Sequence, residues 1–349
     1  MASNETELAW AGPAGAMVMD SAEIRAIVYE SYGAPEVVTL ARVARPAVGP
    51  RDVLVETRAT EVSSGDARLR TATFPAGFGT LGRLMVGWSR PRRHVLGVSV
   101  AGVVVETGSE ITEVSAGDRV VGMTGLALGA HAELCGLSAD HCLVRLPDEV
   151  GFEDAATLPF GGLTALTYLE GKLAVRPGER LLVIGASGAV GAAAVQLGRL
   201  LGAHVTGVCS AGNASLVKGL GAERVIDYRS TDVFASSERW DVVLDTLGLA
   251  PLSDLRRVTT PRGRIGLVAA GVPQMLAGAL VNLTSRQRCR FGPSSEDPRQ
   301  LQRLVEWVRD GEYAPLIDCV LPLERAAEGH ARVDTGHKRG SVLLSVGSR

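Results

Sequence analysis

The 349-residue sequence lacks the features of several specialised protein classes. Its formal net charge is only −2, which gives no electrostatic basis for dedicated nucleic-acid binding. It has no run of 18 apolar residues, because the longest candidate, residues 269–283, is interrupted by Gly271, Pro273 and Gln274. We therefore expect neither a nucleic-acid nor a membrane partner.

Cysteine and aromatic residues are also scarce. The five cysteines are scattered and form no C-x-x-C pair, so a disulfide framework is not expected and a reducing cytoplasm fits best. Residues 1–22 contain Glu5, Glu7 and Asp20 but no Lys or Arg, so they lack the basic start of a secretory leader. We expect them to be a disordered tail.

The chain is rich in glycine and in apolar residues. Its 42 glycines accompany 46% hydrophobic and only 4% aromatic residues, a balance that suits tight turns and close backbone packing around a ligand. A chain of this length exceeds what one core usually organises, so two domains are expected.

Two patterns divide the sequence near Pro147. From residue 24 to about 146, short alternating segments predict an antiparallel, barrel-like domain with strands at 26–29, 37–40, 53–59, 98–106, 119–122 and 130–133. After Pro147, strands alternate with helices, which predicts a doubly wound parallel sheet.

The second half begins with a helix from residue 152 to 169, interrupted near Pro159. The following strands are predicted at 180–184, 204–209, 224–226, 241–245 and 264–268, with helices at 190–201, 214–220 and 252–257. An amphipathic segment at 297–310 and a terminal strand at 340–346 complete the pattern, and that strand could rejoin either domain.

The most informative stretch is residues 180–191, in which an apolar strand runs into three glycines and then a helix. Gly185 and Gly188 would let the backbone turn and approach a pyrophosphate, while Gly191 would permit close helix–strand contact. The N-terminus of the helix offers unpaired N–H groups to the phosphates. The strand, turn, helix and following strand together predict dinucleotide binding rather than a structural glycine turn.

The end of the second strand has no carboxylate to accept the ribose 2′-hydroxyl of NAD. Ser210 and Asn213 instead leave room for a 2′-phosphate, with Lys218 or Tyr228 as further partners, which favours NADP(H). The alternative is an ordinary capped turn with Lys218 on a solvated helix face.

Seven segments in order resemble the medium-chain dehydrogenase/reductase superfamily, in its zinc-independent, quinone oxidoreductase (zeta-crystallin-like) branch. The matching segments are residues 25–36, 52–56, 97–104, 117–120, 158–166, 185–191 and 336–340. The resemblance implies a GroES-like β-barrel catalytic domain at 23–147, a Rossmann domain at 148–316, and a segment at 317–349 that returns to the barrel. It also implies hydride transfer in the cleft between the domains, and a homodimer.

The resemblance further implies a set of cofactor-binding positions in the turn and around it. They are Thr164, Ser187, Gly188, Ala189, Val190, Thr246, Val268 and Lys338. For Thr164, the alternative is a helix threonine that bonds back to a carbonyl.

Zinc ligands of the alcohol dehydrogenases of this superfamily are missing here. Ser64, residues 97–99 and residues 159–160 occupy the corresponding positions, and they offer no soft or imidazole ligand. A second grouping of His131, Cys135, His141 and Cys142 falls on predicted strands whose alternation points the side chains to opposing faces. We therefore expect no metal.

A proton donor is harder to assign. Related enoyl reductases carry a tyrosine where this sequence has Phe74, which cannot donate a proton. Ser64 and Asp66 are candidates for orienting substrate or water, although Asp66 could equally cap the backbone that follows it.

Residues 74–96 form an apolar, glycine-rich insertion that becomes basic at its end. A mobile flap over the cleft, including Phe74 and Trp88, would fit a hydrophobic substrate, whereas the alternative is a surface loop that covers the barrel. The predicted function is a zinc-free NADP(H)-dependent reductase of an activated C=C bond or quinone. Carbonyl reduction and a non-catalytic, crystallin-like or RNA-binding role remain alternatives.

Overall fold

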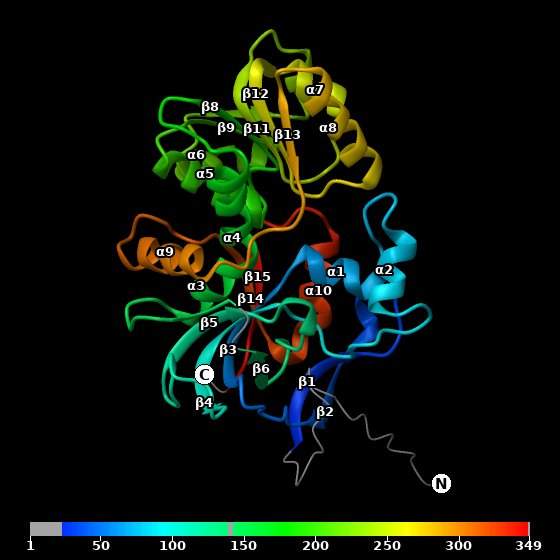
Figure 1. The fold of residues 1–349 in the computed structure, drawn as a ribbon, viewed down its shortest axis with the longest axis vertical. Coiled ribbons are helices and arrows are strands. Elements are labelled where there is room, and N and C mark those ends of the chain that lie inside the picture. The colour runs from blue at the N-terminus through cyan, green and yellow to red at the C-terminus, as the bar shows by residue number, and fades with distance from the viewer. Residues whose placement is uncertain (1–22, 139–141, 348–349) are drawn as a thin grey trace.

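The computed structural model describes residues 23–138 and 142–347, so the predicted disordered tail lies outside the described residues. Two β-sheets dominate, one in each half of the molecule, and helices join and cover them (Figure 1). The α/β fold class, a GroES-like barrel plus a parallel-sheet Rossmann domain, is confirmed.

The barrel domain is built on a mainly antiparallel seven-stranded sheet. Its path is β14-β15-β3-β4-β5-β7, with β6 paired to β3, while β1 and β2 form a separate hairpin. The strands of the first half are β1 (Glu23–Tyr29), β2 (Val38–Ala44), β3 (Asp52–Val62), β4 (Ser99–Thr107), β5 (Arg119–Met123), β6 (Leu134–Ser138) and β7 (Leu143–Arg145).

One strand prediction in this half was wrong. Residues 130–133 are not a strand; Ala132 forms only an isolated bridge with Ala26, and the strand begins at Leu134. Leu128 and Gly129 have positive φ angles, which turn the chain just before the predicted strand. The alternation of residue types at 130–133 does not show that pairing with the rest of the sheet starts only at Leu134.

The Rossmann domain contains a six-stranded parallel sheet in the order β10-β9-β8-β11-β12-β13. Its strands are β8 (Arg180–Ile184), β9 (His204–Cys209), β10 (Arg224–Asp227), β11 (Trp240–Asp245), β12 (Thr259–Leu267) and β13 (Arg288–Phe291). The chain moves outward from β8 in one direction through β10 and in the other through β13. The strand order therefore reverses between β8 and β11, where open α/β sheets bind their ligands.

Four helices cross over the parallel sheet. They are α5 (Ala189–Leu200), α6 (Ala214–Gly219), α7 (Leu252–Arg257) and α8 (Val272–Thr284). α8 was not predicted from the sequence, because Gly271 and Pro273 interrupt the apolar run there. Gly271 is in fact the N-cap and Pro273 lies in the first turn, where proline is tolerated because its missing N–H would be unpaired anyway.

A helical segment connects the two domains at the predicted interruption. It runs through α3 (Phe152–Thr157), a π-helix at Leu158–Gly162, α4 (Leu163–Leu166) and a second π-helix at Thr167–Lys172. One hydrophobic core contains barrel residues such as Ala59 and Ala101 together with α4 and the parallel sheet. The two domains therefore share a core at this segment.

The C-terminal segment returns to the barrel. After α9 (Pro298–Arg309), the chain forms β14 (Ile317–Pro322), α10 (Ala326–Asp334) and β15 (Ser341–Ser345), and β15 pairs antiparallel with β3. Two further helices, α1 (Ser64–Thr71) and α2 (Gly79–Val86), lie in what the sequence presented as loops.

Candidate functional site

The glycine-rich turn after β8 has the geometry that a dinucleotide needs. Gly185 has φ +80°, and a Cβ there would lie 2.6 Å from Thr246 Oγ1. A Cβ on Gly191 would lie 2.0 Å from the carbonyl oxygen of Gly185. Both positions are therefore restricted to glycine, one by conformation and one by close approach of α5 to the strand.

Gly188 differs from its neighbours because it faces open space. Its backbone is in the β region, and the nearest atom to an added Cβ is the Gly185 carbonyl oxygen at 3.6 Å. The first i→i−4 hydrogen bond of α5 runs from Ala192 N to Gly188 O, so the N–H groups of Ala189, Val190 and Gly191 have no intrahelical acceptor. This open cradle at a helix N-terminus fits a pyrophosphate.

Three predicted residues meet beside this cradle. Asn213 Nδ2 donates to Ser187 Oγ at 3.1 Å and to Ser210 Oγ at 3.4 Å. Ser187 comes from the turn, and the other two come from the end of β9. This trio presents hydroxyl and amide groups, with no carboxylate, where the adenosine ribose of a bound dinucleotide would lie.

Of the two further partners that the sequence suggested for a 2′-phosphate, only Tyr228 lies next to the end of β9. Lys218 is exposed on α6, whereas Tyr228 N donates to Cys209 O, which places Tyr228 directly beside the end of β9. The Arg229 guanidinium lies 5.8 Å from the centre of the Tyr228 ring. Sequence reasoning missed Arg229 because its position depends on the pairing of β10 with β9, not on a local motif.

The C-terminal segment of the barrel contacts the same turn. Gly340 N donates to Ser187 O at 2.9 Å, and Lys338 Nζ donates to Gly340 O at 2.6 Å. Burial lowers the pKa of the Lys338 ammonium, while Glu61 and Asp318 oppose that shift. Gly340 thus links the turn of one domain to Lys338 of the other.

The remaining cofactor positions surround the reversal of strand order. Thr246 Oγ1 donates to Ile184 O at 2.8 Å, and Val268 N donates to Asp245 O at 3.0 Å, so both lie at the carboxyl ends of the central strands. Thr164 is buried on α4, and a Cβ on Gly161 of the preceding π-helix would lie 3.2 Å from Ala189 O. The connecting helices therefore pack directly on the start of α5.

The structure corrects the role considered for Asp66. Its carboxylate accepts hydrogen bonds from Ser63 N and Oγ and, at 2.9 Å, from Gly97 N, and the residue is fully buried. Ser63 and Asp66 form a capping box at the start of α1, which confirms the structural alternative. Asp66 is not free to orient substrate, whereas Ser64 is half-buried in the first turn of α1.

The residues at the zinc-ligand positions of the related alcohol dehydrogenases lie close together here, but they offer no zinc-binding group. A Cβ on Gly65 would lie 3.7 Å from the Phe160 ring, so the start of α1 faces the π-helix. Within residues 23–138 and 142–347, no three His, Cys, Asp or Glu side chains group as a metal site requires. In the other grouping, Cys135 and Cys142 pack in different cores, and His141 lies outside the described residues.

Glu61 is a buried acid that the sequence analysis missed. It lies at the end of β3, just before α1, where its carboxylate is fully buried near Ser341 and Lys338. Burial raises the pKa of Glu61 to about 7, and the Lys338 ammonium opposes that rise. The sequence around Glu61 did not indicate that this residue is buried, because an acidic residue at the end of a strand and next to a polar segment is usually exposed.

The insertion contacts the Rossmann domain through the residues that precede α2. Val272 N, at the start of α8, donates to Ala76 O at 2.7 Å, and a Cβ on Gly77 would lie 2.6 Å from Val272 Cβ. The Phe74 ring packs beneath α2 at Gly82. Leu81, Leu84, Met85 and Trp88 are between 52% and 63% exposed, so these four side chains do not cover the barrel.

Family models match both halves of the chain. Residues 49–176 match the alcohol dehydrogenase GroES-like domain, and residues 220–344 match a model described as zinc-binding dehydrogenase. The chain is 30% identical over 334 residues to a chloroplast quinone oxidoreductase of Triphysaria versicolor, covering 92% of this chain and 98% of that protein.

A bacterial relative and a solved structure give the same assignment. The quinone oxidoreductase of Pseudomonas aeruginosa is 30% identical, with 91% of this chain and 98% of the relative covered. The structure of the quinone oxidoreductase from Coxiella burnetii superposes with a TM-score of 0.82 at 27% identity, covering 93% of this chain and all of that one. The chain is therefore an oxidoreductase that belongs to the medium-chain dehydrogenase/reductase superfamily, in its zinc-independent, quinone oxidoreductase-like branch.

Proposed function

We propose that this protein is a zinc-free, NADPH-dependent reductase of an activated C=C bond or a quinone in a small hydrophobic substrate. The observation that carries the proposal is the open cradle at Gly188 beside the carboxylate-free trio of Ser187, Ser210 and Asn213. The names of the relatives support the quinone as an acceptor.

Different residues around the cradle would bind different parts of a dinucleotide. The N–H groups of Ala189 and Val190 would receive the pyrophosphate, and Lys338 would add positive charge from the opposite domain. Ser210 and Asn213 would donate to the 2′-phosphate, and Arg229, whose guanidinium lies against the Tyr228 ring, would be a further source of positive charge. The nicotinamide, when bound, supplies the hydride.

The other half of the cleft would hold and shield the acceptor. The hydrogen bond from Val272 N to Ala76 O joins the two domains next to α2, where it would help to exclude water from the reacting groups. Asp66 is committed to its capping box and Phe74 has no proton to give. Solvent water or the Ser64 hydroxyl is then the proton source for the reduced acceptor.

Turnover against a panel of acceptors tests this proposal. NADPH oxidation should require an added quinone, enone or enoyl thioester, and simple aldehydes should react more slowly. Faster oxidation with aldehydes would favour the carbonyl alternative. NADPH binding without oxidation by any acceptor would instead favour a non-catalytic role.

We also propose a homodimer in a reducing cytoplasm. All five cysteines are free thiols, four of them buried, which suits a reducing compartment. The outer edge of β13 ends the parallel sheet and could pair with a second copy. No helix among the described residues is long and apolar enough to cross a membrane. Light scattering in solution would measure the oligomeric state.

A further inference from the structure

One acid and one base lie together behind the dinucleotide turn, on the side of the barrel. The Glu61 carboxyl group is fully buried at the end of β3, near Ser341 and the Lys338 ammonium. The position of Ser341 follows from the strand register, because Leu343 of β15 lies opposite Glu61 and side chains two residues apart in a strand point to the same face. Glu61 and Ser341 are therefore diagonal neighbours on one face of the sheet.

A short backbone path connects this pair to the turn that would receive the pyrophosphate. Lys338 Nζ donates to Gly340 O at 2.6 Å, and Gly340 N donates to Ser187 O at 2.9 Å. Gly340 also forms an isolated parallel bridge with Gly188. Only glycine fits at position 340, because its φ is +80° and an added Cβ would lie 1.9 Å from Leu316 O. The Lys338 ammonium is thus held against a segment that contacts the cradle directly.

Two further charged side chains near Lys338 pair with each other. Asp318 of β14 accepts hydrogen bonds from Arg332 Nε at 2.5 Å and from Arg332 Nη2 at 2.9 Å, and a third from Arg339 N at 3.0 Å. A carboxylate held by a bidentate guanidinium and a backbone N–H is largely committed to those partners. Glu61 is therefore the acid left to balance the charge of the Lys338 ammonium.

The surroundings of Glu61 allow it to change its charge near neutral pH. Burial raises the pKa of Glu61 to about 7, the Lys338 ammonium opposes that rise, and the Asp66 carboxylate adds to it. Tyr313 is also near Glu61, and burial raises the pKa of its hydroxyl, so it stays neutral. His131 Nε2 donates to the backbone carbonyl oxygen of Glu61 at 3.0 Å. Lys338 is thus the cation whose balance depends on the charge of Glu61.

We propose that Glu61 is a positioning residue that couples dinucleotide binding to proton uptake. When Glu61 is ionised, its negative charge offsets the Lys338 ammonium and opposes the phosphates of NADPH. When Glu61 is protonated, the whole charge of Lys338 acts on the phosphates at the cradle. The coupling is reciprocal, so NADPH binding makes Glu61 hold its proton more tightly, and protonation of Glu61 tightens NADPH binding. This inference rests on the dinucleotide site of the proposed function.

Calorimetric titration of the full chain with NADPH counts the protons. The titration is done at pH 7.5 in Tris and in HEPES, whose ionisation enthalpies differ, so the difference in heat gives the number of protons taken up. The wild type should take up about half a proton per NADPH, because a group with a pKa of about 7 is mostly ionised at that pH before binding. The Kd for NADPH should rise about five- to tenfold between pH 6.5 and pH 8.5, as a coupling of about one pKa unit requires.

Glu61→Gln replaces the acid by a neutral side chain of nearly the same shape. This variant should lose the proton uptake and should bind NADPH about five- to tenfold more tightly than the wild type at pH 8.5. Only the small contribution of the 2′-phosphate, which titrates near pH 6, should remain. A purely structural role for Glu61 would change neither the proton count nor the pH dependence of Kd.

A second pair of variants tests whether the coupling runs through Lys338. Lys338→Met should weaken NADPH binding and should also abolish the proton uptake, because Glu61 without its cation stays protonated. Adding Glu61→Gln to Lys338→Met should then leave the proton count unchanged. This pair also keeps the test decisive if the stability of Glu61→Gln alone is altered.

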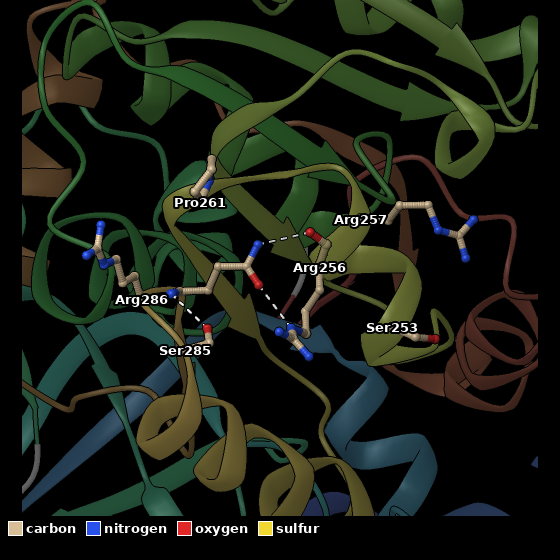
Figure 2. A pocket seen from close by; sticks show the side chains of 7 residues that line it. Ser253, Arg256, Arg257, Pro261, Ser285 and Arg286 are labelled. Carbon is tan, nitrogen blue, oxygen red and sulfur yellow. Dashed lines mark hydrogen bonds between the residues drawn. The ribbon is translucent and has the colours of Figure 1, made fainter.

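Two control variants separate the coupling from general changes in charge. Glu110→Gln removes a 62% exposed acid beside the start of β3, at the opposite end of the strand from Glu61. Arg286→Gln removes a cation from a basic hollow that Arg256 and Arg257 also line (Figure 2). That hollow lies near the amino ends of β12 and β13, whereas the cradle lies at the carboxyl end of β8 in the same parallel sheet. Both controls should show the Kd and the proton count of the wild type.

The outcomes distinguish this proposal from the proposed function. Equal proton counts for the wild type and Glu61→Gln, or a wild-type Kd that does not change with pH, would overturn the proposal and leave the proposed function intact. If the uptake depends on Glu61 but no quinone, enone or enoyl thioester oxidises the bound NADPH, the proposed function fails and the proposal stands. Absence of NADPH binding to the wild type at every pH would overturn both.

Discussion

The two halves of the cleft are built in different ways. On the dinucleotide side, hydrogen bonds join three short segments, the turn at 185–191, residues 210–213 and Gly340, and these bring backbone N–H groups, hydroxyls and an amide to one open cradle. On the substrate side, the Asp66 carboxylate is consumed by its capping box, and the large side chains exposed on α2 are apolar. The dinucleotide side is therefore determined by a recurring backbone geometry, whereas the substrate side is determined by packing between residues far apart in the sequence.

The largest expected effect concerns Glu61, on the substrate side. Its pKa is raised to about 7, so the folded state holds the proton more tightly than the unfolded state, and stability is lost as pH rises from about 4.5 to 7. Glu61→Gln should therefore raise the free energy of unfolding at pH 8 by up to about 3 kcal/mol and remove that pH dependence. Chemical denaturation at pH 5 and pH 8 measures both. A variant that is less stable at pH 8 would show that the Glu61 carboxylate is stabilised by Lys338.

The second largest effect is expected for a substitution in the cradle at Gly188. Gly188→Ala places a methyl group in the open space above the turn, where no atom of the chain lies closer than 3.6 Å. NADPH affinity should fall by about 100-fold, equivalent to about 2.7 kcal/mol, while the free energy of unfolding changes little. Gly219→Ala, also in open space but on α6, is the control. Calorimetric titration that gave the same affinity for both variants would place the pyrophosphate elsewhere.

Much of the dinucleotide side could be predicted from the sequence, because glycine spacing, a strand and a helix start are local features. β8, β9 and α7 have the predicted bounds, and Ser187, Ser210 and Asn213 do meet. Glu61 and Arg229 could not be predicted, because their surroundings depend on pairing between distant strands. The exposure of α2 and α8 was equally hidden, since an apolar run in a sequence does not show which face is covered.

Cofactor choice gives an intermediate effect. Ser210→Asp places a carboxylate beside Asn213 and Ser187, where it should repel a 2′-phosphate and accept a ribose hydroxyl. The ratio of NADPH to NADH affinity should fall by about tenfold or more. If the wild type binds both cofactors equally and the variant does not alter the ratio, the trio does not contact the 2′-phosphate.

The insertion at residues 74–96 should give a smaller effect. Trp88→Ala should raise KM for a bulky apolar substrate about three- to tenfold and leave NADPH affinity unchanged, because Trp88 is a 63% exposed apolar side chain just after α2, away from the glycine-rich turn. Steady-state kinetics at saturating NADPH measure it. Phe74→Ala is a less direct test because that ring packs under α2 at Gly82, so its stability must be measured as well. Loss of stability with unchanged KM in both variants would make the segment ordinary packing.

Metal removal should give no effect at all. Ser64, Val98, Ser99 and Phe160 offer no zinc-binding group at the positions of the zinc ligands, so dialysis against a chelator should leave turnover unchanged. Stoichiometric zinc in the purified protein, together with loss of turnover after its removal, would contradict this prediction.

A single-turnover experiment tests the central claim, that the cradle at Gly188 presents NADPH to an acceptor on the apolar side of the cleft. Protein with bound NADPH is mixed rapidly with a quinone, and the loss of NADPH absorbance is followed for the wild type and for Gly188→Ala. The wild type should oxidise its bound NADPH in one fast phase that depends on quinone concentration, and the variant should oxidise little under the same conditions. Bound NADPH that persists in the wild type with every quinone and enone tried would contradict the account.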